Sequence, residues 1–118
     1  MNITIYHNPR CSQSRATLEA LRARGIEPTI IEYLQAPPSH TELTALLAAL
    51  GMTARALARR QEAAWQAAGL DTASEQEIIE TMVREPVLIE RPIVVRGQRA
   101  VLGRPPANIE QLFNDADA

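Results

Sequence analysis

Hydrophobic and polar positions follow one another along the chain in a pattern that predicts a mixed α/β protein. Residues 2–6 (NITIY) are β-branched and aromatic and predict a short buried strand. Residues 12–24 are good helix formers, and Gly25 stands where a C-terminal cap is expected. Residues 28–34 (PTIIEYL) return to strand-forming side chains. Strand, helix and strand with short connections predict a parallel βαβ unit.

The middle of the chain predicts helices. Ser39 followed by Glu42, and Ser74 followed by Glu77, each have the form of a capping box ahead of apolar residues at helical spacing. Residues 53–69 between them are rich in Ala and Arg and show no strand pattern. We therefore expect a helical block in this region.

The last third returns to strands. Residues 92–95 and 99–102 flank a short turn and predict a β-hairpin, with residues 87–89 as an apolar lead-in segment. Residues 107–113 predict a short closing helix.

This order, βαβ, a helical block and then ββα, is typical of an α/β thioredoxin-like fold in which all strands share one sheet. The chain has 118 residues and 46% hydrophobic content, which suits one domain. We predict a single domain over residues 1–118 with a helical insertion at about residues 39–85.

Charge and composition exclude some classes of function. The formal net charge is −2, which provides no overall basic field for binding nucleic acid. No apolar run is long enough to span a membrane and no secretory leader pattern is present, so a cytoplasmic location is expected, without a membrane partner. The chain has one Cys and two well-separated His, so we expect no metal site and no intrachain disulfide.

The single cysteine, Cys11, lies in the segment HNPRCSQSR at residues 7–15. We expect it at the start of the first helix, after the first strand, where unpaired backbone N–H groups and the helix dipole favour a thiolate. A lone Cys is more often an inert core residue, but the carboxyl end of a parallel strand is where open α/β sheets place their ligands.

The same loop offers groups for binding an oxyanion: the backbone amides of residues 11–15, the hydroxyls of Ser12 and Ser14, and the guanidinium of Arg15. A cysteine with an anion cradle is also typical of low-mass phosphatases. That class needs Arg six residues after the cysteine, where this chain has Thr17, so the spacing excludes it.

Three segments carry a family resemblance: HNPRCSQSR, RPIVV at 91–95 and GRPP at 103–106. With them the chain resembles the glutaredoxin-coupled arsenate reductases of the thioredoxin-like superfamily, over residues 3 to about 112. The resemblance implies that Cys11 is the nucleophile on arsenate.

The resemblance also implies the residues that act with the cysteine. Arg91, Arg104 and Arg59 would bind the oxyanion, with Arg60 as the neighbouring alternative to Arg59. His7, Asn8, Ser14 and Arg15 would support the thiolate and its loop, and Pro92 would follow a cis peptide bond beside the cysteine.

The activity implied is reduction of arsenate to arsenite through a cysteine adduct, and the ligand expected at the site is arsenate or another small oxyanion. Glutathione would be the co-substrate and glutaredoxin the partner, with no bound cofactor. Two alternatives remain open: a glutathione-linked thiol oxidoreductase without arsenate activity, and a regulator of the same fold that binds RNA polymerase. The disulfide-stress form of that regulator needs a Cys-x-x-Cys pair, and the second position here is Ser14.

Overall fold

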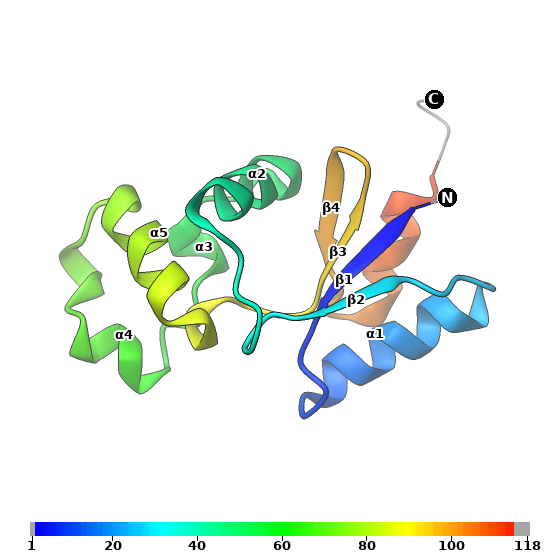
Figure 1. The fold of residues 1–118 in the computed structure, drawn as a ribbon, viewed down its shortest axis with the longest axis horizontal. Helices are drawn as coiled ribbons and strands as arrows, with labels where there is room; N and C mark the ends of the chain where they lie inside the picture. The colour runs from blue at the N-terminus through cyan, green and yellow to red at the C-terminus, as the bar shows by residue number, and fades with distance from the viewer. Residues whose placement is uncertain (1, 115–118) are drawn as a thin grey trace. The chain divides into compact units, whose positions relative to one another are not determined.

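A computed structural model describes residues 2–114 (Figure 1). The described chain divides into two compact units, each treated separately below. One is formed by the described residues of Met1–Tyr33 and Arg91–Ala118, and the other by Leu34–Glu90. The prediction of a single domain with an insertion at about residues 39–85 stays a prediction.

The first unit is built on a four-stranded sheet with the order β2-β1-β3-β4. Strands β1 (Ile3–His7) and β2 (Thr29–Glu32) are parallel, and helix α1 (Ser12–Ala23) connects them. On its other side β1 pairs antiparallel with β3 (Ile93–Arg96). The βαβ unit and the hairpin therefore share one sheet, as the sequence pattern predicts.

Strand β3 continues through a turn into β4 (Arg99–Leu102), its antiparallel partner, and Gly97 in that turn has a φ of 62°. A 3₁₀ helix, η3 (Pro106–Leu112), follows β4 and packs against α1, β3 and β4.

The core of this unit lies between the sheet, α1 and η3. Apolar side chains at alternate positions of β1 meet those at helical spacing on α1, because a strand repeats every two residues and a helix every 3.6. The members of this core are Ile3, Ile5, Leu18, Leu21, Val94, Ile109 and Leu112. This packing fixes α1 beneath the sheet, and with it the loop that contains Cys11.

The second unit is helical. It contains α2 (His40–Leu50), α3 (Ala54–Leu57), α4 (Ala63–Ala67) and α5 (Glu75–Arg84). Short 3₁₀ helices, η1 (Leu70–Thr72) and η2 (Pro86–Leu88), precede and follow α5. Helix α5 packs against α2, α3 and η2.

Both predicted capping boxes are present in this unit. Ser39 accepts a hydrogen bond from the Glu42 amide, Ser74 accepts one from the Glu77 amide, and each glutamate side chain binds back to the cap.

Two predicted segments differ from the structure to different degrees. Residues 87–89 do not extend the hairpin: they lie largely in η2, and only Ile89 forms a single antiparallel bridge, to Ala58. The predicted short closing helix is present one residue earlier, as a 3₁₀ helix over Pro106–Leu112. Proline at the start of each segment favours a tight helical turn, since its fixed φ suits the first helical position and its missing N–H is not needed there.

Across residues 2–114, none of the helices combines the length and the apolar character that crossing a bilayer demands.

Candidate active site

Cys11 is the N-cap residue of α1 and is partly exposed. Its backbone is extended, with φ −95° and ψ 123°, so the chain turns there from the loop into the helix. The Cys11 amide donates to the Asn8 carbonyl at 3.0 Å, and the Cys11 carbonyl accepts from the Arg15 amide at 3.0 Å. Cys11 therefore lies where the sequence predicts it, after the end of β1 and at the start of α1.

Polar side chains fix the loop from within. Ser14 is fully buried, shares a 2.6 Å hydrogen bond with Nδ1 of His7, and accepts another from the Asn8 amide at 3.0 Å. The Asn8 side chain in turn accepts from the Arg10 amide at 3.0 Å. Because these groups are buried and mutually bonded, they define one conformation of the loop.

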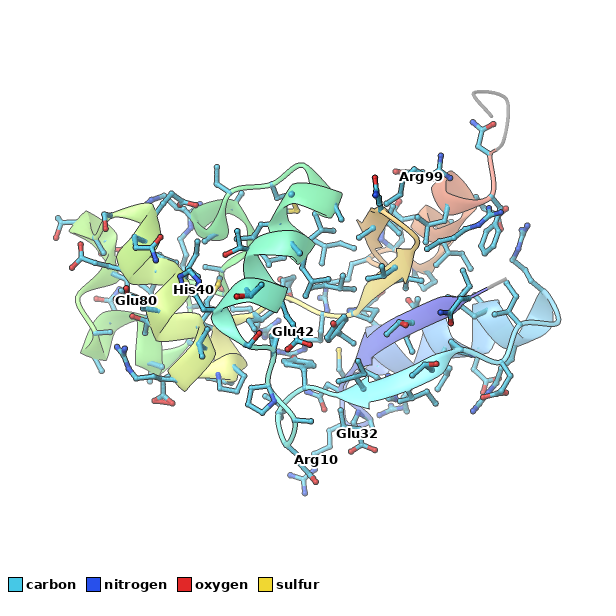
Figure 2. All side chains as sticks on the ribbon, turned by 45° about the horizontal axis from the view of Figure 1, so that its top comes forward. Arg10, Glu32, His40, Glu42, Glu80 and Arg99 are labelled. Carbon is cyan, nitrogen blue, oxygen red and sulfur yellow. The ribbon has the colours of Figure 1, made fainter. Side chains whose placement is uncertain are left out.

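Two basic side chains near Cys11, Arg10 in the loop and Arg15 in the first turn of α1, lie at the surface. Arg15 donates to the Pro9 carbonyl at 3.0 Å and so braces the loop from outside. Arg10 is exposed, and Figure 2 shows it at the periphery of the molecule.

The surroundings of His7 favour its neutral form. Burial lowers the pKa of His7, Glu32 raises it, and Arg22 and Arg15 lower it further, with a net fall below 6.5. A neutral imidazole is a matching partner for the Ser14 hydroxyl.

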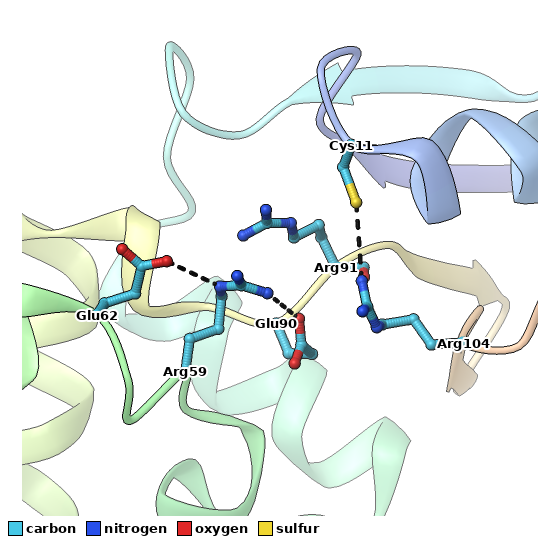
Figure 3. Close-up of polar contacts among 6 residues, drawn as sticks. All are labelled: Cys11, Arg59, Glu62, Glu90, Arg91 and Arg104. Atoms are coloured by element: carbon cyan, nitrogen blue, oxygen red, sulfur yellow. Dashed lines mark hydrogen bonds and ion pairs between the residues drawn. The ribbon is translucent and has the colours of Figure 1, made fainter.

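The environment of Cys11 favours the thiolate. Burial raises the pKa of the thiol, but the amides of Ser14 and Gln13 and the guanidinium of Arg91 outweigh it, so that the pKa falls below its ordinary value. Arg104 adds a further cation, because its Nη1 donates to the Cys11 sulfur at 3.7 Å (Figure 3). The sulfur is therefore surrounded by donors and positive charge.

Arg91 and Arg104 come from two loops that are joined to each other. The Arg91–Pro92 and Arg104–Pro105 peptide bonds are both cis. Arg104 also donates to the Arg91 carbonyl at 3.3 Å, and Gly103 N–H donates to the Pro92 carbonyl at 2.9 Å. These two hydrogen bonds join the loops of both arginines beside the cysteine. The cis bond at Pro92 agrees with the sequence expectation, and the second one was not anticipated.

Further residues that hold this arrangement escaped the sequence analysis. Thr17 is buried in α1 and donates to the Gly103 carbonyl at 2.6 Å. Asn108 donates to the carbonyls of Leu102 and Arg104 at 3.0 and 3.1 Å. Neither residue belongs to a chemical motif. The helical spacing of Thr17 from the buried Ser14 and Leu21 was the available signal for its inward orientation.

Arg59 belongs to the helical unit. Its side chain is 14% exposed and forms ion pairs with Glu90 at 2.6 Å and with Glu62 at 3.2 Å (Figure 3). Burial lowers the pKa of Arg59, and the two carboxylates more than offset this and raise it. The backbone is also fixed, since the Arg59 amide donates to the Leu88 carbonyl at 2.8 Å. The choice between Arg59 and Arg60 as the third oxyanion ligand stays a prediction.

Fold and site together define a thioredoxin-like protein with a cysteine at a helix N-terminus and arginines on the neighbouring loops. The family model described as "ArsC family" matches residues 6–112, and the chain belongs to that family.

Individual relatives agree with this assignment. An arsenate reductase of Escherichia coli is 45% identical over 98% of this chain and 83% of its own length. The uncharacterized protein YfgD of Escherichia coli strain K12 is 43% identical over 93% of this chain and 95% of its own length. The solved structure of an arsenate reductase from Vibrio cholerae superposes with a TM-score of 0.90 at 41% identity, over 94% of this chain and 97% of that one.

Proposed function

We propose that this protein reduces arsenate to arsenite through a covalent adduct on Cys11, with glutathione and glutaredoxin as electron donors. The observation that carries the proposal is the Cys11 sulfur, which receives a hydrogen bond from Arg104 at 3.7 Å and whose pKa is lowered by Arg91 and two helix amides. Family membership and the named arsenate reductases among the relatives support it.

In the first step the thiolate attacks the arsenic atom. A sulfur–arsenic bond forms, one arsenic–oxygen bond breaks, and the oxygen leaves as water after taking up protons from the substrate and solvent. The backbone amides at the start of α1 with Arg91 and Arg104 supply donors for the remaining oxygens. The resemblance adds Arg59 as a third ligand.

The second step needs an external thiol, because Cys11 is the only cysteine of the chain. The glutathione sulfur attacks the Cys11 sulfur, the sulfur–arsenic bond breaks, and its electron pair stays on arsenic, which leaves as arsenite. Glutaredoxin then removes glutathione from the mixed disulfide and restores the Cys11 thiol. We also propose a cytoplasmic location, where the glutathione pool keeps such a thiol reduced.

The test is arsenite production from arsenate with glutathione and glutaredoxin present. Wild type is compared with Cys11→Ser, Arg91→Ala and the control Arg84→Ala, which changes an exposed arginine of helix α5. The proposal requires turnover that stops without Cys11, falls strongly without Arg91 and survives in the control.

A second candidate is a glutathione-linked thiol oxidoreductase that does not use arsenate. The observation in its favour is that Glu62 and Glu90 occupy the guanidinium of Arg59, which reduces the positive charge that residue can offer to a dianion. This function would be indicated by rapid removal of glutathione from a mixed-disulfide substrate by a protein that forms no arsenite.

A further inference from the structure

The side-chain oxygen of Gln13 is a buried hydrogen-bond acceptor in the first turn of α1. Gln13 is the second residue of α1, two positions after Cys11, and within residues 2–114 its buried Oε1 has no hydrogen-bond partner. Buried acceptors are nearly always bonded, since losing water without gaining a partner is unfavourable. An exception next to a reactive thiol therefore calls for a functional explanation.

Helical geometry places Gln13 on the side of α1 that carries the arginine loops. Gln13 lies one turn before Thr17, and residues four apart share a face of a helix. Thr17 donates to the Gly103 carbonyl at 2.6 Å, so this face is directed at the loop that contains Arg104. Side chains on a helix also lean toward its N-terminus, which brings the Gln13 amide closer to the level of the thiol.

The groups that act on the Cys11 sulfur are all donors. They are the amides of Gln13 and Ser14 and the guanidinium groups of Arg91 and Arg104. Donors bind any tetrahedral oxyanion, whether or not its oxygens carry protons. The Gln13 oxygen is different, because it can bind only an oxygen that bears a hydrogen.

We propose that Gln13 is a specificity-determining residue that selects oxyanions retaining a proton. Hydrogenarsenate and hydrogenphosphate have an O–H group to donate to Oε1, whereas sulfate has the same shape and charge at neutral pH and has none. Bound sulfate would leave Oε1 of Gln13 without a hydrogen bond and place a sulfate oxygen lone pair next to the Oε1 lone pairs. This inference rests on the proposed function, since it assumes that the site beside Cys11 binds an oxyanion.

The test measures how well inorganic phosphate and sulfate slow alkylation of Cys11 by iodoacetamide. It runs at about pH 8, where phosphate is mainly the singly protonated dianion, with ionic strength held constant by chloride. Comparing two dianions cancels their general attraction to the arginines. The readout is the ratio of the two half-protecting concentrations, and the alkylation rate without anion reports whether the thiol environment is intact.

Wild type is expected to be protected by phosphate at lower concentration than by sulfate. Gln13→Met keeps the length of the side chain and removes the acceptor, so the preference should fall about fivefold, the equivalent of one neutral hydrogen bond. Gln13→Glu retains an acceptor, so it should keep the preference even if both anions bind less well. Glu19→Met, at an exposed position of the same helix, is the control and should leave the ratio unchanged.

The outcomes separate this inference from the function on which it rests. Equal protection of wild type by both anions, or an unchanged ratio in Gln13→Met, would overturn the role of Gln13 and leave the reductase proposal standing. If neither anion protects wild type, the oxyanion site itself is wrong and the inference is overturned with it.

Discussion

Gly103 lies where the surrounding side chains leave no room for a Cβ atom, so Gly103→Ala is an informative perturbation. A Cβ built there would lie 2.6 Å from Cγ2 and 2.8 Å from Oγ1 of Thr17, and 3.0 Å from Cγ of Pro92. Thr17 and Pro92 are both buried, so neither can swing out into solvent. The added methyl group must push α1 away from the loop that carries Arg104.

The cost can be worked out from the contacts involved. Overpacking of a tight site costs about 1–3 kcal/mol. Displacement also weakens the 2.6 Å hydrogen bond from Thr17 to the Gly103 carbonyl, which adds about 1 kcal/mol. We therefore expect Gly103→Ala to lower the free energy of unfolding by about 2–4 kcal/mol. Gly97→Ala, where no atom lies within 4 Å and only the φ of 62° is strained, should cost about 1 kcal/mol.

The assay is urea denaturation followed by circular dichroism, arranged as a double-mutant cycle with Thr17→Ala. Thr17→Ala removes both of the closest atoms, so the methyl group at position 103 gains space and the double variant should be more stable than Gly103→Ala alone. Strict additivity of the two single changes would refute the reasoning. So would a loss at position 103 no larger than that at position 97.

Three further predictions concern charge. The absorbance of the Cys11 thiolate should titrate at a pKa below that of a free thiol, and Arg91→Ala should raise that pKa because it removes a stabilising cation. Folding depresses the pKa of His7 below 6.5, so the stability that neutral His7 contributes is complete above pH 6.5 and is lost as the pH falls from there through the folded-state pKa. Urea midpoints measured across this range should show the loss in wild type and a smaller loss in His7→Asn. Glu90→Gln should weaken the ion pair of Arg59 and lower the free energy of unfolding by about 1 kcal/mol, less so at high salt, as urea denaturation with and without added salt would show.

The features that could be predicted from the sequence are those encoded within a few neighbouring residues. Both capping boxes appear as predicted because Ser and Glu three positions apart satisfy helix-end amides through local bonds alone. The strand at the start of the chain and the position of Cys11 at the N-cap follow equally from local pattern. The antiparallel place of the hairpin in the sheet follows from the element order, since both βαβ and ββ units must bury one common face.

The features that could not be predicted depend on partners distant in the chain. Residues 87–89 have strand-like composition. The Glu90 N–H nevertheless donates to the Leu57 carbonyl, and the Arg59 N–H donates to the Leu88 carbonyl. The backbone of this segment is therefore bonded to the region of α3 and not to the sheet. Nothing in the local sequence marks Leu57 as that partner. The apolar pattern therefore predicted a lead-in to the hairpin where tertiary bonding formed a 3₁₀ turn.

The same division between local and distant partners runs through the candidate site. Cys11 and the amides that stabilise its thiolate lie within four residues of one another, so the sequence alone indicates a reactive thiol. Arg91 and Arg104 reach it only through β3, β4 and the bonds that join their loops, and a family resemblance was needed to single them out. The Gln13 acceptor had neither signal, because a glutamine in a helix is unremarkable until its oxygen is found buried without a partner among residues 2–114. Residues that make a thiol reactive can therefore be found from local pattern, whereas the residues proposed to choose its substrate require the fold.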